Sequence, residues 1–452
     1  MITKPKGTYD LYGSEGAKFL RLQNIIINLM ECYNFEYLRT PAFERCELFH
    51  RGVGETTDIV KKETYDFTDR GDRTLTLRPE GTASAVRCFI ENKMHAMALP
   101  KKFWYLEPMY RYERPQKGRF REHFQFGCEI FGSFDALSDA EIISIPYTLL
   151  SNLGLTNIKV HINTLGDNKS RENYRNALVK YLEPHIDSLC SDCKERFKKN
   201  PLRILDCKVD KDSDILKNVP KITDYLEEEA KERFNKVTQY LDTLNIPYVV
   251  DSNIVRGLDY YTSTVFEIIY DENITLCGGG RYNNLIESLD GTATPAVGFG
   301  MGIERLMETL DNEGIDLDYS DYTDCYVVNV GETLKKEALE LAYALRIMGF
   351  KTEMDLMDRN VKANFKHADN INARFTIIVG EDELKENCFK VKNMKTKQEE
   401  LVNTNMIISY LQEKIEEIEE ESYNSKSCSC HDDEDEECSC SNCTCHDDDY
   451  NF

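Results

Sequence analysis

The spacing of hydrophobic and polar positions gives the first third of the chain a mixed character. Apolar residues recur every three or four positions over residues 17–33, which predicts an amphipathic helix. Apolar runs at 37–43, 103–112 and 125–131 predict strands, and Pro41 restricts the first of them to an edge or an end. The polar connector at 113–123 is typical of a hairpin loop. This part of the chain therefore predicts helix combined with antiparallel strands.

The pattern changes between about residues 165 and 245, where charged residues and strong helix formers dominate. We interpret this part as a helical insertion, because strand patterns return afterwards at 248–255 and 261–270. A Gly-rich stretch follows at 277–281, and a helical pattern covers 303–310.

A second domain is predicted after an acidic linker at 311–321. Strand, helix and strand patterns alternate at 325–330, 334–348 and 375–379. This order predicts a small α/β domain with a partly parallel sheet.

Charge is concentrated at the C-terminal end. The 452 residues carry a net charge of −24, of which residues 413–452 hold −13 and the rest −11. Residues 111–121 contain five basic side chains and one acidic, so this hairpin is either a polyanion-binding site or a solvated surface. A mean hydropathy of −0.51 and the lack of a long apolar run predict no membrane span. Without an apolar signal core at the N-terminus, we expect a cytoplasmic protein with reduced thiols.

Glycines mark two places where backbone turns sharply or approaches a ligand closely. They are residues 278–280 and the alternating Gly298, Gly300 and Gly302. The second spacing, GxGxG, misses the GxGxxG pattern, so a dinucleotide-binding fold is not predicted.

Together these segments resemble the histidyl-tRNA synthetases, a family of class II aminoacyl-tRNA synthetases, over about residues 6–402. The most specific matches are VRGLDYY at 255–261 and GGGRY at 278–282. The segment LRPEGT at 77–82 resembles the amino-acid-binding loop of the family. The three class motifs are matched by residues 39–44, 110–129 and 296–306.

The resemblance implies a fold and a domain order. It implies an α+β catalytic domain with an antiparallel sheet at 1–322, containing a helical insertion at about 166–245. It implies an α/β anticodon-binding domain at 323–415, and leaves 416–452 as a disordered acidic tail rich in Cys and His. A homodimer is implied as well, because motif 1 builds a dimer interface in this class.

The implied reaction is the ATP-dependent ligation of L-histidine to tRNA(His) through a histidyl-adenylate, with release of AMP and diphosphate. Arg111, Arg256 and Arg305 would be the catalytic cations on the phosphates of ATP, and Mg²⁺ would bridge ATP oxygens. The residues implied to bind histidine are Glu80, Gly81, Thr82, Gln125, Glu129, Tyr260, Tyr261 and Tyr282. Those implied to meet the acceptor end of the tRNA are Arg114, Gln116, Arg119 and Arg121.

Two other functions are compatible with parts of the sequence. One is a synthetase-like regulatory subunit of histidine biosynthesis or a histidine sensor, although such paralogues usually lack the Arg256 peptide and the anticodon domain. The other is a metal-storage or metal-sensing protein, which only the tail suggests.

Cysteines form two groups. In the tail, a Cys-Ser/Thr-Cys-His-Asp-Asp pattern repeats after 15 residues, which indicates either a zinc-binding appendage or a plain acidic tail. Its candidate ligands are Cys428, Cys430, His431, Cys438, Cys440, Cys443, Cys445 and His446. In the insertion, Cys190 and Cys193 form a CxxC with Cys207 further along, and we interpret them as free thiols. A zinc site there, with His185 as fourth ligand, is the alternative.

Overall fold

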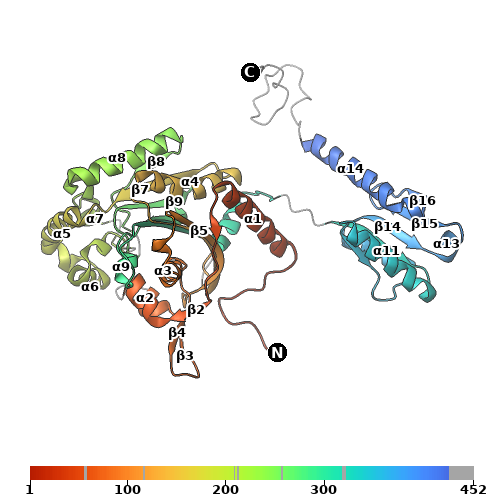
Figure 1. Ribbon diagram of the computed structural model, residues 1–452, viewed down its shortest axis with the longest axis horizontal. Coiled ribbons are helices and arrows are strands. Elements are labelled where there is room, and N and C mark those ends of the chain that lie inside the picture. The colour runs from red at the N-terminus through yellow and green to blue at the C-terminus, as the bar shows by residue number, and fades with distance from the viewer. Residues whose placement is uncertain are drawn as a thin grey trace, which may run out of the picture. The chain divides into compact units, whose positions relative to one another are not determined.

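The computed structural model describes residues 1–54, 57, 59–115, 118–207, 209–210, 213–255, 258–317 and 322–426, with the backbone alone for 421–426. Gln116, Arg256 and all eight predicted ligands of the tail lie outside these residues. The chain divides into two compact units at residue 319 (Figure 1). None of the described helices is long and apolar enough to cross a membrane.

An eight-stranded sheet forms the centre of the first unit. It is antiparallel except at its two edges, where β1 runs parallel to β5 and β8 runs parallel to β7. The prediction of an antiparallel sheet is thereby confirmed. The spatial order is β1 (Glu36–Tyr37), β5 (Lys101–Tyr110), β6 (Glu122–Phe131), β11 (Ala296–Gly302), β10 (Ile274–Arg281), β9 (Thr264–Tyr270), β7 (Ile158–Thr164) and β8 (Tyr248–Val250).

Helices cover both faces of this sheet, because alternate side chains of each strand point to opposite faces. One apolar cluster joins the sheet to α1 (Gly13–Cys32), α4 (Ala136–Asn152), α8 (Glu228–Thr243) and α10 (Ile303–Asn312). The other joins it to α3 (Thr82–Glu91), α9 (Leu285–Ser288) and the insertion. In Figure 1, α4 and α8 lie above the sheet, and α3 lies below it.

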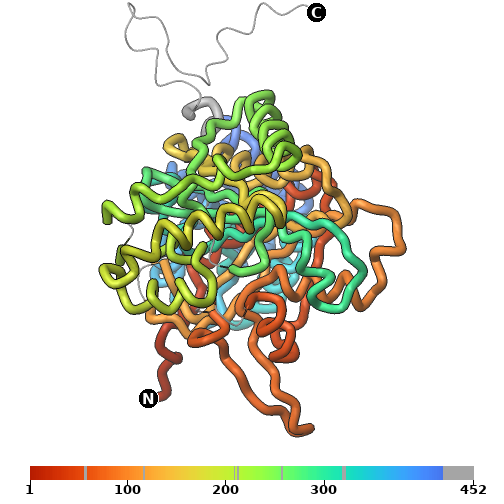
Figure 2. The backbone as a smooth tube through the Cα atoms, turned by 90° about the vertical axis from the view of Figure 1, so that its left-hand side faces the viewer, coloured from red at the N-terminus to blue at the C-terminus, as the bar shows by residue number. Residues whose placement is uncertain are grey.

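A small sheet lies beside the main one, formed by β2 (Phe43–Arg45), β4 (Thr74–Leu77) and β3 (Asp66–Thr68), and α2 (Cys46–Val53) follows β2. The β3–β4 hairpin projects from the body of the unit in both views (Figures 1 and 2).

The single strand predicted at 37–43 is wrong, because β1 ends at Tyr37 and β2 begins at Phe43 in another sheet. Between them, the Arg78 guanidinium donates to the carbonyls of Thr40 and Pro41 at 2.9 and 3.2 Å, so these groups are bonded outside any strand ladder.

The insertion is helical, as predicted, and lies between β7 and β8. The predicted strand at 248–255 is shorter than expected, ending at Val250. The helices of the insertion, in addition to α8, are α5 (Asn168–Leu182), η3 (Glu183–Ser188), α6 (Ser191–Lys199), η4 (Pro201–Ile204), α7 (Asp214–Lys217) and η5 (Ile222–Tyr225). Short helical turns elsewhere are η1 (Ile59–Glu63), η2 (Met94–Ala96), η6 (Glu332–Leu334) and η7 (Thr404–Met406).

The second unit contains a five-stranded sheet. β12 runs parallel to both of its neighbours, and the remaining pairs are antiparallel, so the predicted partly parallel sheet is confirmed. The order is β13 (Thr352–Met354), β12 (Thr323–Asn329), β14 (Ala373–Val379), β15 (Cys388–Asn393) and β16 (Glu399–Asn403). Its helices are α11 (Lys335–Ile347), α12 (Val361–Asn370), α13 (Glu381–Lys385) and α14 (Ile407–Lys426).

Candidate active site

The predicted histidine-binding residues meet where β6 pairs with β11. The antiparallel register places Gly298 opposite Glu129 and Gly302 opposite Gln125. A Cβ atom at position 298 would lie 1.7 Å from Glu129 Oε2, and one at position 300 would lie 2.1 Å from Gln125 Nε2. The alternating glycines of β11 therefore leave the space that these two side chains occupy.

Glu129 is the centre of a buried polar network. Its carboxylate accepts hydrogen bonds from Thr82 Oγ1 at 2.8 Å, from the Tyr105 hydroxyl at 3.1 Å, and from the Tyr282 hydroxyl. Burial outweighs these donors and raises the pKa of Glu129 to about 8. This raised pKa favours the protonated carboxyl at neutral pH.

Glu80 is held by the start of α3. Its carboxylate accepts from the backbone N–H groups of Thr82 and Ala83 at 3.0 and 2.7 Å, which satisfies donors that the first turn of a helix leaves free. Burial raises its pKa. The neighbouring Gly81 N–H donates to Gln125 Oε1 at 3.2 Å, so this loop is tied directly to β6.

Tyr105 belongs to the site, although the sequence did not single it out. Its ring lies against Gly81 and Gly127, where an added Cβ at either glycine would approach ring atoms to 2.3 Å. Tyr105 pairs with Gly127 across the β5–β6 ladder. The feature that could have identified Tyr105 is an aromatic residue opposite a glycine on the neighbouring strand. It can be recognised only when the pairing register of the two strands is known.

Three tyrosines pack together beside Glu80 and Glu129, with the Tyr260 hydroxyl 3.5 Å from Glu80 and the Tyr282 hydroxyl bonded to Glu129. The rings of Tyr260 and Tyr261 lie 4.7 Å apart between centroids, and those of Tyr260 and Tyr282 lie 5.6 Å apart. Arg171 of α5 donates to the backbone carbonyls of Tyr261 and Thr262 at 2.9 and 2.8 Å. The insertion therefore supports the backbone of this segment, a role that the sequence did not indicate.

Arg281, in the GGGRY peptide, has an anchoring role. It is fully buried and donates to the Asp139 carboxylate at 2.9 Å. It also donates to the carbonyls of Ser133 and Asp135 at 2.8 and 2.9 Å. These bonds fix the end of β10 to the start of α4, one residue before Tyr282 enters the pocket.

A cluster of arginines lies at the other end of the site. Arg111 donates to the Pro79 carbonyl at 2.7 Å, next to Glu80, and Arg305 donates to the Thr275 carbonyl at 2.8 Å. Glu113 lies between Arg111 and Arg119, 3.7 Å from a guanidinium nitrogen of each. Backbone carbonyls hold Arg111 and Arg305, and the carboxylates of Glu113, Glu308 and Glu267 balance part of the charge of Arg305. The cluster is therefore a concentration of guanidinium groups suited to binding an anion.

His123 shows the effect of that charge. Burial, followed by the guanidinium groups of Arg111 and Arg305, lowers its pKa to about 3, so its ring is neutral throughout the physiological range. Next to it, the Phe124 N–H donates to Glu304 Oε1 at 2.7 Å, and the Tyr9 hydroxyl donates to the same oxygen at 2.5 Å. Neither Tyr9 nor His123 was among the predicted site residues.

The predicted tRNA-contacting residues that the structure describes lie on the connector between β5 and β6. The Arg121 guanidinium stacks 3.9 Å over the Tyr112 ring and donates to the Glu113 carbonyl at 3.3 Å. The Arg119 side chain is 38% exposed, and Arg114 is exposed as well. The connector therefore presents an accessible cation beside the arginine cluster.

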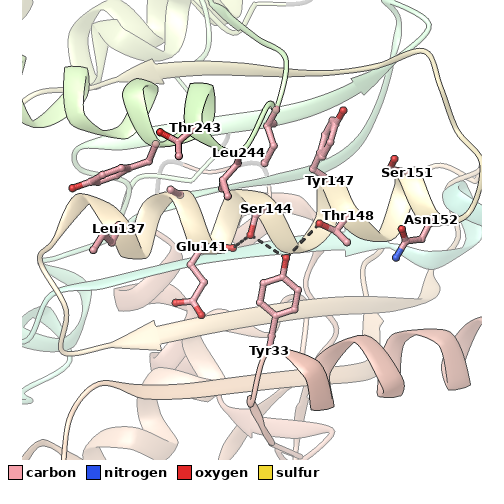
Figure 3. Close-up of a pocket in the computed structure, with 13 residues that line it drawn as sticks. Tyr33, Leu137, Glu141, Ser144, Tyr147, Thr148, Ser151, Asn152, Thr243 and Leu244 are labelled. Atoms are coloured by element: carbon pink, nitrogen blue, oxygen red, sulfur yellow. Dashed lines mark hydrogen bonds between the residues drawn. The ribbon is translucent and has the colours of Figure 1, made fainter. Parts of the chain in front are cut away.

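A separate hollow lies between α4 and α8 (Figure 3). In it the Tyr33 hydroxyl bonds with Ser144 and Thr148 at 3.2 and 3.3 Å, and Glu141 pairs with Lys102 at 2.5 Å. None of the predicted site residues lines this hollow, and its carboxylate already has a cation partner.

The antiparallel sheet, its buried Glu129 network and arginine cluster, and the separate α/β unit define a class II aminoacyl-tRNA synthetase. A family model described as histidyl-tRNA synthetase matches residues 7–306, and one described as anticodon binding domain matches residues 324–414. The chain belongs to the histidyl-tRNA synthetase family.

Individual relatives agree with this assignment. The chain is 47% identical to the histidine–tRNA ligase of Staphylococcus haemolyticus, covering 92% of this chain and 100% of that protein. It is 48% identical to that of Anoxybacillus flavithermus, covering 90% and 98%. The apo crystal structure of the S. aureus histidyl-tRNA synthetase matches with a TM-score of 0.79 and 40% identity, covering 91% of this chain and 100% of that one. The predicted fold and class of enzyme, a histidine–tRNA ligase, are confirmed, and a regulatory subunit of histidine biosynthesis is not favoured.

Proposed function

We propose that this chain ligates L-histidine to tRNA(His) through a histidyl-adenylate, and that the two ends of its site have separate tasks. One end recognises histidine and the other binds the phosphates of ATP. The observation that carries the proposal is the buried Glu129 carboxyl, bonded to Thr82, Tyr105 and Tyr282. Thr82 also donates to Glu80, on which Arg111 of the arginine cluster acts electrostatically.

At the histidine end, the side-chain imidazole requires a hydrogen-bond partner on each ring nitrogen. Glu129 supplies one partner, and the tyrosines that line the pocket, Tyr260, Tyr261 and Tyr282, exclude water from it. Glu80 and Gln125, with Gly81 and Thr82, bind the ammonium and carboxylate end of the amino acid. An apolar analogue would leave these buried groups unpaired and would be rejected strongly.

At the phosphate end, the histidine carboxylate attacks the α-phosphate, the bond to diphosphate breaks, and an adenylate anhydride forms. Arg111 and Arg305 bind the α- and γ-phosphate oxygens, because a planar guanidinium can make two parallel hydrogen bonds to them. Arg256, in the same peptide as Tyr260 and Tyr261, is proposed as the third cation. In the second step a hydroxyl of the terminal adenosine attacks the carbonyl, and AMP leaves.

The residues present fit the ATP–Mg²⁺ complex. Mg²⁺ binds phosphate oxygens together with one or two carboxylates and water. The carboxylates of Glu113 and Glu267 both act electrostatically on Arg305, so oxygen donors of the required kind border the arginine cluster. When bound there, the ion would neutralise charge on the phosphates.

The remaining assignments follow from the family membership. The acceptor end of the tRNA would meet Arg114, Gln116, Arg119 and Arg121, and the domain at 323–415 would meet the anticodon. The matches ending at 306 and beginning at 324 support a catalytic domain at 1–322. We infer a cytoplasmic homodimer, tested by sedimentation at micromolar concentration, where a monomer would contradict it.

Histidine-dependent ATP–diphosphate exchange tests the proposal. The wild-type chain should exchange label only with histidine present, and Arg256→Ala should lower the rate by about 10²-fold or more, the usual loss when one transition-state cation is removed. Arg70→Ala, which alters an exposed arginine in the β3–β4 turn, is the matched control and should retain the rate. A chain that binds histidine without exchange would instead be a sensor or regulatory subunit.

We also propose that the tail binds Zn²⁺ through its repeated cysteines and histidines, supported by the sequence repeat alone. Replacing the six tail cysteines with serine should abolish that binding and leave aminoacylation unchanged. Competition with a chromophoric chelator measures it, and an affinity weaker than about micromolar would contradict a structural zinc site.

A further inference from the structure

Three cysteines and an aspartate converge inside the helical insertion, away from the catalytic residues. Among the described residues, the ligand atoms of Cys190, Cys193, Cys207 and Asp210 all lie within 4.8 Å of one another. Cys190 and Cys193 flank the start of α6, and Cys207 and Asp210 follow η4. Two segments separated by 13 residues thus bring four potential metal ligands together.

The two segments have the same local geometry. Each is a four-residue turn with a ligand at its first and last positions, Cys-x-x-Cys and Cys-x-x-Asp. In the first turn the Cys193 N–H donates to the Cys190 sulfur. In the second, the Asp210 N–H donates to the Cys207 sulfur at 3.3 Å. Such N–H groups orient a sulfur, as hydrogen bonds around metal ligands commonly do.

The distances match a tetrahedral zinc site. Zinc bonds of about 2.3 Å to sulfur and 2.1 Å to oxygen place two sulfurs about 3.8 Å apart, and a sulfur and an oxygen about 3.6 Å apart. The Cys190 and Cys207 sulfurs lie 3.6 Å apart, and the Cys207 sulfur lies 3.5 Å from Asp210 Oδ2. A disulfide requires about 2.05 Å, and all three cysteines are free thiols.

We propose that Cys190, Cys193, Cys207 and Asp210 bind one structural Zn²⁺ ion. Three sulfurs and one oxygen favour zinc over Mg²⁺ or Ca²⁺, which prefer oxygen ligands. The Cys190 N–H donates to Asp210 Oδ2 at 3.0 Å, which orients the carboxylate as hydrogen bonds around metal sites commonly do.

This proposal replaces two expectations from the sequence. The free-thiol interpretation did not anticipate a carboxylate directed at three converging sulfurs. The fourth ligand is Asp210 rather than His185, whose ring packs against Tyr181 at 5.6 Å between centroids. Asp210 was missed because aspartate at the end of a Cys-x-x-Asp turn gives no familiar metal-binding spacing.

The ion would hold a segment that supports the catalytic site. The chain between the two ligand pairs runs through most of α6 and through η4, with Asn200 at their junction and Arg203 in η4. Asn200 Nδ2 donates to Asp259 Oδ1 at 3.2 Å, and the Arg203 guanidinium lies 3.8 Å from the same oxygen. Asp259 belongs to the 255–261 peptide, immediately before Tyr260 of the pocket. Zinc would therefore stabilise the surface against which that peptide packs.

Metal analysis of the full-length chain tests the proposal. The six tail cysteines are first changed to serine, so that the tail contributes no metal, and the protein is purified without chelators. We expect about one zinc per chain, as in other structural sites, and below about 0.1 after Cys190→Ser with Cys193→Ser. Cys46→Ser is the matched control, because Cys46 belongs to another group of potential metal ligands, with His50 at 3.2 Å and Asp66 nearby.

Loss of the zinc in Cys46→Ser instead would overturn the assignment. The double variant could fail to fold, so a second measurement uses the chain in which only the six tail cysteines are changed. X-ray absorption at the zinc edge of that protein reports the ligands of the ion directly. It should show three sulfurs at about 2.3 Å and one oxygen at about 2.1 Å. Less than about 0.1 metal per chain in that protein, or a Cys190–Cys207 disulfide by mass spectrometry, would also refute the proposal.

Discussion

The two ends of the catalytic site use opposite electrostatic strategies. At the histidine end, burial keeps the Glu129 carboxyl neutral by raising its pKa to about 8. At the phosphate end, burial and two arginines keep the His123 ring neutral by lowering its pKa to about 3. The first end selects by pairing buried hydrogen-bonding groups, and the second attracts anions by the charge of its arginines. Substitutions at the two ends should therefore affect different substrates.

The largest effect is expected from Glu129→Gln. The amide keeps the shape of the side chain but cannot ionise, so it can never accept hydrogen bonds on both terminal atoms from Thr82, Tyr105, Tyr282 and the substrate. We expect kcat/KM for histidine to fall by about 10²- to 10⁴-fold. The KM for ATP should change by less than about threefold, because the substitution leaves the contacts with ATP at the other end unchanged. Diphosphate exchange with each substrate varied in turn measures both.

Glu91→Gln is the control for this substitution, because Glu91 makes an exposed ion pair with Arg87 in α3. It should leave both parameters unchanged. An equal loss for histidine and ATP in Glu129→Gln would show that the two ends are not separate.

A smaller effect is expected from Arg305→Lys, at the other end. Lysine keeps the charge but loses the planar pair of donors, so kcat for adenylate formation should fall by about 10²-fold. Histidine affinity, measured by calorimetry without ATP, should be retained. The matched control is Arg21→Lys, because Arg21 also donates to a backbone carbonyl, that of Leu317, in the same unit. Weaker histidine binding in Arg305→Lys would show that the histidine end and the phosphate end are not separate.

Removing one tyrosine hydroxyl at each end should raise the KM of the corresponding substrate by about tenfold. Tyr282→Phe and Tyr9→Phe each remove one hydroxyl donor from a buried carboxylate, Glu129 in one case and Glu304 in the other. Each carboxyl keeps another donor, so the loss is that of one hydrogen bond, about 1–2 kcal/mol. Tyr282→Phe should raise the KM for histidine, and Tyr9→Phe the KM for ATP, because Glu304 also fixes the Phe124 N–H beside His123. Steady-state kinetics with histidine or ATP limiting measures the two KM values. A higher KM for ATP in Tyr282→Phe, or for histidine in Tyr9→Phe, would contradict the assignment of the two ends.

The sequence predicted the main elements of the fold because their periodicity is strong. The helix at 17–33, the two long strands around 103–131 and the alternation after residue 323 all reflect burial of one face. The strand at 37–43 failed because an arginine far along the chain, Arg78, bonds the carbonyls around Pro41. Such a contact depends on tertiary structure and leaves no local pattern.

The residues of the candidate site also divide into those that the sequence predicted and those that it missed. Glu80, Gln125 and Glu129 were predicted because they lie within recognisable peptides, and the structure brings them together. Tyr105 and Arg171 were missed because they act through register and through a backbone carbonyl, respectively. A single sequence shows which residues carry chemistry more readily than it shows which residues hold them in place.

The stability that the two ends contribute to the folded chain should respond to pH in opposite directions. Below its ordinary pKa of 4.5, Glu129 is protonated whether the chain is folded or not, and the stability it contributes is lost as the pH rises through about 8. His123 is neutral in both states above its ordinary pKa of 6.5, and its contribution is lost as the pH falls from there toward about 3. One proton taken up or released on unfolding changes the free energy by at most about 1.4 kcal/mol per pH unit.

Urea unfolding followed by the fluorescence of Trp104 measures these contributions, because the chain has one tryptophan and it is buried in β5, next to Tyr105. Between pH 6 and 7.5, the wild type should lose stability relative to Glu129→Gln by about 1 kcal/mol per pH unit. Between pH 6 and 4, it should lose a similar amount relative to His123→Gln, because glutamine does not titrate. A stability difference that stays constant with pH in either variant would mean that the corresponding residue is charged in the folded protein, and the two ends would then no longer be opposites.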